Sequence, residues 1–395
     1  MVRSKTLCLK ALKLTRNPVK VLIFLLIAVF VFNEYLIYVL QRWTWPSLTP
    51  SDSAARLPED EERILFVADP QIIGVHDTHI NNQLLIYDAD RYLATTFQHA
   101  FNYVQPNIVV FLGDLMDEGS VANGPEYDLY VQRFHQIFST STSHVKRIYL
   151  PGDNDVGGEM WDDRVPFKVD RFNQYFRKEE LVKSKFIDIF TFNYNVGDAV
   201  NVKMEARLQE LMADSAAPFR IIINHMNLLS QTRPEFDRLI TLTNASLIFT
   251  AHAHRAIMYN CSNCRDPEYL DALWDGERFL MKTDVIYTLN LGVFSLLHEI
   301  VVPTCSYRMG VANMGYGAAI IDRGGLVRYV VLSSPSRYRC LMLYGAVLVI
   351  VLLFLVATAT LRLYKLCWVR GSLLVLRQRS VQSCCLSDSG CSCLA

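Results

Sequence analysis

The chain has 395 residues, about half of them hydrophobic, and its 39 basic and 39 acidic residues cancel to a formal net charge of zero. This balance gives no indication of nucleic-acid binding, which draws on an excess of basic residues. The hydrophobic excess is concentrated in two blocks near the ends of the chain, and the stretch between them has the size of one α/β domain. The composition therefore favours a folded domain held between two membrane anchors.

The first apolar block covers residues 21–40 and follows a basic tail at residues 1–20. A helix of about 20 residues spans roughly 30 Å, the thickness of the hydrocarbon core of a bilayer. The block is longer than a signal-peptide core and no small-x-small cleavage site follows it, so we predict a retained transmembrane helix. Because Asn33 and Glu34 are costly in hydrocarbon, the span is expected to end near them.

Residues 41–62 are rich in Pro, Ser and acidic side chains and are predicted to form a linker to a folded domain at residues 63–336. A second, uncharged apolar block at residues 341–361 is predicted to be a second transmembrane helix. A buried core helix is the alternative for either block. Residues 362–395 form a Cys-rich tail with several basic residues.

Basic residues lie on the terminal side of both blocks, which by the positive-inside rule places both tails in the cytosol and the central domain in the lumen. In that oxidising compartment Cys261 and Cys264 either bridge each other or pair elsewhere. Asn244 and Asn260 begin glycosylation sequons that fit the same orientation. The basic residues are Arg3, Lys5, Lys10, Lys13, Arg16, Lys20, Arg362, Lys365, Arg370, Arg377 and Arg379.

Short apolar runs that end in polar residues predict the strands of a buried sheet, with helical patterns at residues 82–104, 126–138 and 168–177 between the early ones. Polar side chains that directly follow strands match the rule that open α/β sheets bind ligands at the carboxyl ends of their strands. Two later strands predict a second sheet and a four-layer α/β/β/α sandwich. The predicted strands are residues 64–68, 108–112, 147–150, 220–223, 247–250, 288–295 and 316–322.

Five polar motifs occur in order, each directly after one of these strands. Singly each is a weak signal, since a Gly-Asp after a strand is usually a turn and a His-x-His pair is more often at the surface or in the core. Five in this order are improbable by chance and predict a metal site. The motifs are DPQ (69–71), GDLMDEG (113–119), PGDND (151–155), NHM (224–226) and AHAH (251–254).

The ordered set resembles the calcineurin-like metallophosphoesterase superfamily, whose motifs are D-x-H, G-D, G-N-H-D, an isolated His and G-H-x-H. The resemblance covers the whole central domain. GDLMDEG, a later VPTCSYRMG segment at residues 302–310 and the two-anchor layout resemble one membrane-anchored branch. That branch contains metallophosphoesterase 1, a GPI-anchor ethanolamine-phosphate phosphodiesterase, and fungal cell-division-control relatives.

The resemblance implies seven metal ligands around two divalent cations. Asp114 is expected to bridge both cations and to set their spacing. Oxygen donors outnumber the histidines in the set, which favours manganese, iron or magnesium over zinc, and the family implies Mn²⁺. The remaining ligands are Asp69, Gln71 and His254 on the first cation, and Asp153, His225 and His252 on the second.

Two positions depart from the family pattern. Gln71 stands where the superfamily commonly has His, although its side-chain oxygen can still coordinate a cation. Asn154 replaces the His that normally protonates the leaving oxygen, and losing such an acid typically costs on the order of 10²–10⁴ in rate because a neutral amide delivers no proton. Asp155 is kept as a candidate catalytic residue. His76 and His79 are candidate substitutes for the acid, but ordinary loop histidines are the favoured interpretation.

By resemblance, the predicted function is removal of ethanolamine phosphate from GPI anchors in the endoplasmic reticulum or Golgi membrane, which promotes ER-to-Golgi transport of GPI-anchored proteins. Anchoring at both ends would raise the effective concentration of the site near lipid substrates. The partners implied are the GPI lipid, GPI-anchored cargo and coat adaptors. The alternative, favoured by Asn154, is a catalytically impaired metal-binding trafficking scaffold or cargo receptor.

Overall fold

The computed structural model of the chain divides into two compact units, which are described one at a time. The larger unit covers Tyr35–Arg337, and the smaller consists of Met1–Glu34 with Tyr338–Ala395. The residues that the structure describes are 18–48, 60–76, 82–140, 142, 144–158, 162–177, 179–193, 202–230, 234–262, 277–293 and 296–385.

The first sheet of the larger unit has six strands in the order β10-β13-β12-β1-β2-β3. Three of them, β1, β2 and β3, are parallel neighbours, so their carboxyl ends meet at one edge. The others run antiparallel to their neighbours. The strands are β1 (Glu61–Val67), β2 (Ile108–Leu112), β3 (Lys146–Leu150), β10 (Tyr287–Asn290), β12 (Gly315–Asp322) and β13 (Leu326–Ser333).

The second sheet has seven strands in the order β4-β5-β6-β7-β11-β8-β9. Its centre, β5-β6-β7-β11, is parallel, and the strands at either side are antiparallel. The strands are β4 (Leu181–Lys183), β5 (Ile187–Thr191), β6 (Phe219–Ile223), β7 (Leu247–Thr250), β8 (Ile257–Ser262), β9 (Glu277–Leu280) and β11 (Leu296–Val301).

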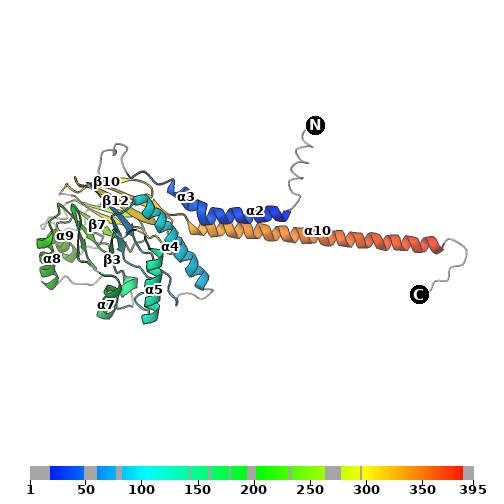
Figure 1. Cartoon of the computed structure of the whole chain (residues 1–395), viewed down its shortest axis with the longest axis horizontal. Coiled ribbons are helices and arrows are strands. Elements are labelled where there is room, and N and C mark those ends of the chain that lie inside the picture. The colour runs from blue at the N-terminus through cyan, green and yellow to red at the C-terminus, as the bar shows by residue number, and fades with distance from the viewer. Residues whose placement is uncertain are drawn as a thin grey trace, which may run out of the picture. The chain divides into compact units, whose positions relative to one another are not determined.

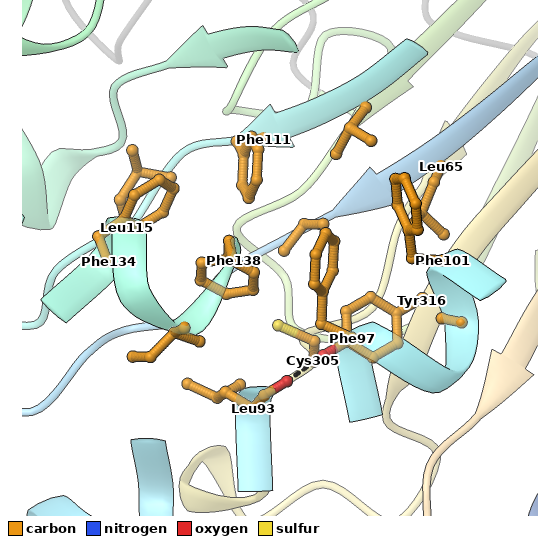
Figure 2. Close-up of a cluster of buried hydrophobic side chains, with 14 of the residues drawn as sticks. Leu65, Leu93, Phe97, Phe101, Phe111, Leu115, Phe134, Phe138, Cys305 and Tyr316 are labelled. Atoms are coloured by element: carbon orange, nitrogen blue, oxygen red, sulfur yellow. Dashed lines mark hydrogen bonds between the residues drawn. The ribbon is translucent and has the colours of Figure 1, made fainter. Parts of the chain in front are cut away.

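Helices cover the outer faces of the two sheets (Figure 1). Three hydrophobic clusters fill the spaces between the layers. Side chains alternate along each strand. Leu65 of β1 therefore packs toward the helices, where Figure 2 shows it near Phe97 and Phe101, whereas Phe66 stacks on Phe249 of the second sheet, with ring centroids 4.1 Å apart. The helices are α4 (Asn82–Val104), α5 (Gly124–Ile137) and α7 (Pro166–Tyr175) on the first sheet, and α8 (Val202–Asp214) and α9 (Pro234–Thr243) on the second.

The predicted fold class, α/β with two sheets, is confirmed, but the folded domain begins earlier than the sequence predicts. Helix α3 (Ile37–Arg42) already belongs to the larger unit, and β1 starts inside the predicted linker. Trp45 and Leu48, also in that linker, are buried in the first core cluster. The indole N–H of Trp45 donates to the carbonyl oxygen of Ser333 at 2.9 Å. A composition rich in polar residues conceals these two anchoring apolar side chains.

In the described part of the chain, two helices are long and apolar enough to cross a membrane, Val19–Arg42 and Arg337–Tyr364. The first consists of α2 (Pro18–Val31), a π-helical turn (Phe32–Leu36) and α3. The second is the start of α10 (Arg337–Cys385), which continues as helix well beyond the predicted end of the block.

Within the smaller unit, Asn33 and Glu34 are buried in the π-helical turn. The Asn33 side-chain amide donates to the carbonyl oxygen of Cys340 at 2.9 Å, and the Tyr344 hydroxyl donates to Glu34 at 2.8 Å. We predicted that the apolar span ends near these polar residues. The helix continues through them, and groups on α10 provide their hydrogen-bond partners, so the end of the span stays a prediction.

Candidate two-metal site

The candidate ligands stand in strained loops that directly follow the parallel strands. Residues other than glycine rarely adopt positive φ. Eight described residues do so, and five of these are predicted ligands. Such strain costs roughly 1–3 kcal/mol per residue and persists where the surrounding structure enforces it, commonly at functional sites. The five are Asp69 (φ 46°), Gln71 (43°), Asp114 (51°), His252 (62°) and His254 (58°).

Two motif glycines let these loops approach one another. At Gly113 (φ 96°) an added Cβ atom would lie 2.4 Å from Nδ1 of His225. At Gly152 it would lie 2.1 Å from Oδ1 of Asp114. A side chain at either position would displace a candidate ligand, which explains why glycine precedes the aspartate in both the GDLMDEG and PGDND motifs.

One cluster of potential ligand atoms comes from Asp114, Asp153, His225 and His252, and these atoms all lie within 4.8 Å of one another. Oδ1 of Asp153 is 3.0 Å from Nε2 of His225 and 3.1 Å from Nδ1 of His252. Nδ1 of His225 faces the carbonyl oxygen of Leu112 at 2.7 Å, which fixes the ring so that Nε2 points into the cluster.

A second cluster consists of Asp69, Asp114 and His254, again with ligand atoms within 4.8 Å of one another. Gln71 adjoins it: its side-chain nitrogen is 3.1 Å from Oδ2 of Asp114 and 3.2 Å from Nε2 of His254. Turning this amide over would direct its carbonyl oxygen to the same place. Asp114 belongs to both clusters, which is the arrangement expected of a bridging carboxylate.

The charges at the site fit divalent cations. Oδ2 of Asp69 is buried without a hydrogen-bond partner, and burial raises the pKa of this carboxyl to about 8. Burial lowers the pKa of His254 to about 4, so its imidazole is neutral at pH 7, the form that ligates metals. Burial opposes the charged form of His225, but the carboxylates of Asp114, Asp153 and Asp69 outweigh it and raise the His225 pKa well above its usual value. Cations would supply the positive charge that these carboxylates lack.

Residues 62–256 match the family model described as calcineurin-like phosphoesterase. The chain contains a calcineurin-like phosphoesterase domain. It is 32% identical to Metallophosphoesterase 1 of Danio rerio over 157 residues, which cover 39% of this chain and 38% of that protein. It is 28% identical to Metallophosphoesterase 1 of Mus musculus over 245 residues, 60% of this chain and 58% of that protein. The chain thus spans less than two thirds of the length of either relative.

Among solved structures, a purple acid phosphatase from yellow lupin (Lupinus luteus) seeds is similar to this chain with a TM-score of 0.45 and 12% identity. The alignment covers 71% of this chain and 53% of the lupin protein.

Asn154 lies on the accessible side of the candidate two-metal site. Its backbone N–H donates to Oδ1 of Asp114 at 3.0 Å, and its side-chain amide donates to Oδ2 of the same residue at 3.3 Å. Asn154, His252 and His254 are partly exposed, whereas Asp69, Asp114 and the other predicted ligands are buried. A substrate would therefore approach past the asparagine and the two histidines.

Asp155, which we predicted to be catalytic, faces into the phosphoesterase scaffold. It is fully buried and accepts three backbone hydrogen bonds, from the N–H groups of Leu115 (3.0 Å), Met116 (3.0 Å) and Gly152 (2.9 Å). These bonds tie the loop that follows Asp114 to the start of the next motif. These contacts are those of a residue that positions Asp114, and the catalytic role of Asp155 stays a prediction.

The VPTCSYRMG segment, which the sequence marks only as a branch signature, holds the first motif of the phosphoesterase domain. The Thr304 hydroxyl donates to the backbone carbonyl oxygen of Asp69 at 2.7 Å. The Arg308 guanidinium donates to the carbonyl oxygen of Gln71 at 2.9 Å and to Asp117 at 2.8 Å. Each side chain fixes a strained ligand position, a role that sequence reasoning missed.

Glu299 on β11 is a second positioning residue that the sequence did not reveal. Its buried carboxylate accepts from the backbone N–H groups of Leu228 (2.8 Å) and Leu229 (2.6 Å) and from the Thr250 hydroxyl (2.8 Å). It therefore joins the loop after His225 to the end of β7, from which His252 follows. An isolated glutamate in an apolar strand was the available signal.

The side chain of His76, the candidate substitute acid, pairs with a residue outside the two ligand clusters. Its Nε2 pairs with Glu126 at the start of α5, at 3.1 Å, and its ring is largely exposed. His79 lies outside the described residues. None of the described histidines beyond the predicted ligands belongs to a ligand cluster.

Proposed function

We propose that this chain is a metal-dependent phosphodiesterase of the secretory pathway that removes ethanolamine phosphate from GPI anchors and so promotes ER-to-Golgi transport of GPI-anchored proteins. The observation that supports it most is the sharing of Asp114 between two ligand clusters. When bound, two divalent cations, Mn²⁺ by family resemblance, polarise a phosphoryl group and lower the pKa of a bound water.

The predicted ligands form two sets, one for each cation. Asp69, Gln71, Asp114 and His254 would hold the first cation. Asp153, His225 and His252 would hold the second, with Asp114 between them. On the open side, the Asn154 amide donates a hydrogen bond toward the phosphoryl oxygens or the leaving oxygen, but it carries no proton to release. The leaving group must then take its proton from solvent.

Separate observations support the proposed location in a secretory membrane. Two apolar helices are long enough to span a bilayer, and basic residues flank their terminal sides. Cys261 is disulfide-bonded, as expected of a domain in an oxidising lumen; Cys264 lies outside the described residues. Anchoring supports a lipid substrate, and resemblance to the membrane-anchored branch supports the GPI lipid, its protein cargo and coat adaptors as partners.

Full-length protein purified in detergent tests the proposal. With Mn²⁺, turnover is expected on a bis-aryl phosphodiester and release of ethanolamine phosphate from a GPI glycolipid. Asp114→Asn should abolish both activities, whereas the same change at the exposed Asp170 of α7 should abolish neither. Turnover of the soluble diester without release of ethanolamine phosphate from the GPI glycolipid would contradict GPI as the substrate. Equal rates in Asp114→Asn and the parent protein would contradict the assignment of Asp114 to the catalytic metal site.

Asn154 specifically favours a second candidate function, that of a metal-binding scaffold. Asn154→His restores the family acid and separates the two. Mn²⁺-dependent turnover in the parent protein supports the enzyme, whether or not the variant is faster. Mn²⁺ binding without turnover in the parent, with a gain on the order of 10² or more in Asn154→His, supports the scaffold.

A further inference from the structure

One face of α4 carries exposed apolar side chains at an edge of the phosphoesterase domain. Leu84, Tyr87, Asp88 and Arg91 follow the spacing i, i+3, i+4, i+7, so they share one face of the helix. Leu84 is 70% exposed and Tyr87 65% exposed. Leu85 is also exposed beside them. A cluster of large apolar side chains on a surface indicates an interaction site more than scattered single ones do.

The same face contacts the two points at which the apolar helices join the larger unit. Asp88 accepts a hydrogen bond from Nε of Arg337, the residue at which α10 begins, at 3.0 Å. The Arg91 guanidinium lies 5.9 Å from the ring centroid of Tyr35, the residue at which the larger unit begins. Leu84 and Tyr87 therefore lie one turn of helix beyond both junctions.

The direction of α4 follows from its contacts with α3. Tyr35 lies near Arg91, Tyr38 near Tyr92 (ring centroids 6.2 Å apart), and Arg42 near Tyr103 (5.7 Å from its ring), so α3 and α4 run in the same direction. Moving back along α4 toward Leu84 is therefore movement in the direction that leads along α3 toward Tyr35, the residue at which the larger unit begins. Seven residues of helix carry Leu84 about 10 Å beyond Arg91.

We propose that the first turns of α4 rest in the interfacial region of the same bilayer that anchors the chain, with lipid as the partner of Leu84, Leu85 and Tyr87. This inference rests on the membrane anchoring in the proposed function. Leucine suits the acyl boundary and tyrosine the headgroup level, where its hydroxyl stays hydrated. Arg91 and Arg337 lie one turn toward the domain, at the level of phosphate groups.

This contact would set how the site meets its substrate. Ile73, in the loop that carries the ligands Asp69 and Gln71, lies in one buried cluster with Ala89 and Tyr92 of α4. A membrane-resting α4 thus places the first-motif loop next to the headgroup layer. The substrate class it favours is a phosphoester carried on a membrane lipid, presented at headgroup depth.

Photocrosslinking of the full-length protein in phosphatidylcholine–phosphatidylethanolamine vesicles tests the contact. A benzophenone amino acid replaces Tyr87, and in the matched control it replaces Phe167 of α7, which is 68% exposed. We expect lipid adducts at position 87 at roughly ten times the yield found at position 167. Equal yields, or protein adducts at position 87, would overturn the proposal.

Two further measurements separate this proposal from the anchoring on which it rests. Flotation with the vesicles after carbonate washing reports anchoring: protein that does not float contradicts both ideas, and floating protein without adducts at position 87 contradicts only the α4 contact. In the double variant Leu84→Ser, Tyr87→Ser, the ratio of rates on vesicle-embedded to soluble diester should fall by about tenfold. Leu129→Ser, an equivalent change on the exposed face of α5, should keep the parent ratio; an equal fall in both variants would contradict the contact.

Discussion

Five buried carboxylates around the candidate site fall into two groups with opposite surroundings. Asp155 and Glu299 each accept three hydrogen bonds from backbone N–H groups or a hydroxyl. Asp69, Asp114 and Asp153 mainly face one another, histidines and amides, and Asp69 has an oxygen without any partner. Hydrogen-bond donors of the protein satisfy the carboxylates of the first group. Those of the second group require the positive charge of bound cations. Residue type alone does not separate scaffold from site; the donors around each carboxylate do.

The largest expected effect comes from removing a carboxylate of the second group. Asp69→Asn should lower turnover by about 10²–10³-fold, the size that follows from losing one charge stabiliser at a reacting centre. The metal-free variant should unfold at the same or a higher urea concentration than the parent protein, because one of three crowded carboxylates is gone. Mn²⁺-dependent rates and urea unfolding in chelator measure the two effects. A metal-free variant less stable than the parent would place Asp69 in the scaffold group.

Glu299→Gln should show the opposite pattern. Its amide nitrogen replaces one accepting oxygen, so a buried backbone N–H faces another donor, and the free energy of unfolding should fall by about 2–3 kcal/mol. Urea unfolding of the metal-free protein measures this change, with Glu277→Gln on the exposed edge of β9 as the control. If stability were unchanged while turnover collapsed, Glu299 would belong with the ligands.

Arg308 tests whether positioning acts through the ligands themselves. Arg308→Lys keeps the charge but not the two-armed contact with Gln71 and Asp117. Apparent Mn²⁺ affinity should fall by about 10–100-fold, as is typical when an outer partner of a metal ligand is lost. Metal titration of activity should show recovery at high Mn²⁺. The control Arg177→Lys, at an exposed position just after α7, should behave like the parent protein. A loss of turnover that excess Mn²⁺ does not restore would contradict a role of Arg308 in positioning the metal ligands.

The sequence predicted the strand ends well because each candidate ligand follows a local pattern. Apolar runs before Asp69, Asp114 and His225 are themselves the strands that carry these residues, so chain order and spatial order agree. The parallel strands β2 and β7 match their predicted bounds, and α4 matches at both ends. Local periodicity was sufficient wherever one element alone determined the position of a residue.

The supporting residues could not be predicted in the same way. Thr304, Arg308 and Glu299 act on backbone groups of segments far away in the chain, and no spacing in the sequence records such contacts. Trp45 was likewise placed in a linker because its partner, Ser333, is distant in sequence. Antiparallel strands such as β8 and β13 were missed because no polar motif follows them in the sequence.

Proton release on metal binding offers a further test of the second group of carboxylates. Burial raises the pKa of Asp69 to about 8, so at pH 7 the metal-free carboxyl is mostly protonated, and cation binding requires the carboxylate. Mn²⁺ binding at pH 7 should therefore release more than one proton: that of Asp69, and that of His225, whose pKa the neighbouring carboxylates hold well above its usual value against the effect of burial. The release should decrease as the pH rises. Calorimetry in buffers of different ionisation enthalpy measures it. Equal proton release by the parent protein and Asp69→Asn would mean that Asp69 is already charged in the metal-free protein.

The smallest effect is expected in the apolar helices, where a buried carboxylate meets a neutral partner. Glu34 accepts a hydrogen bond from the Tyr344 hydroxyl, a contact that requires no cation. A double-mutant cycle of Glu34→Leu with Tyr344→Phe should give a coupling of about 0.6 kcal/mol, the average for hydrogen bonds between membrane helices. The control cycle pairs Glu34→Leu with Thr358→Val, whose hydroxyl bonds to its own helix at Leu355, and should give no coupling. Unfolding in detergent measures both coupling energies. Equal couplings would mean that the hydrogen bond from Tyr344 of α10 to the buried Glu34 adds nothing to stability.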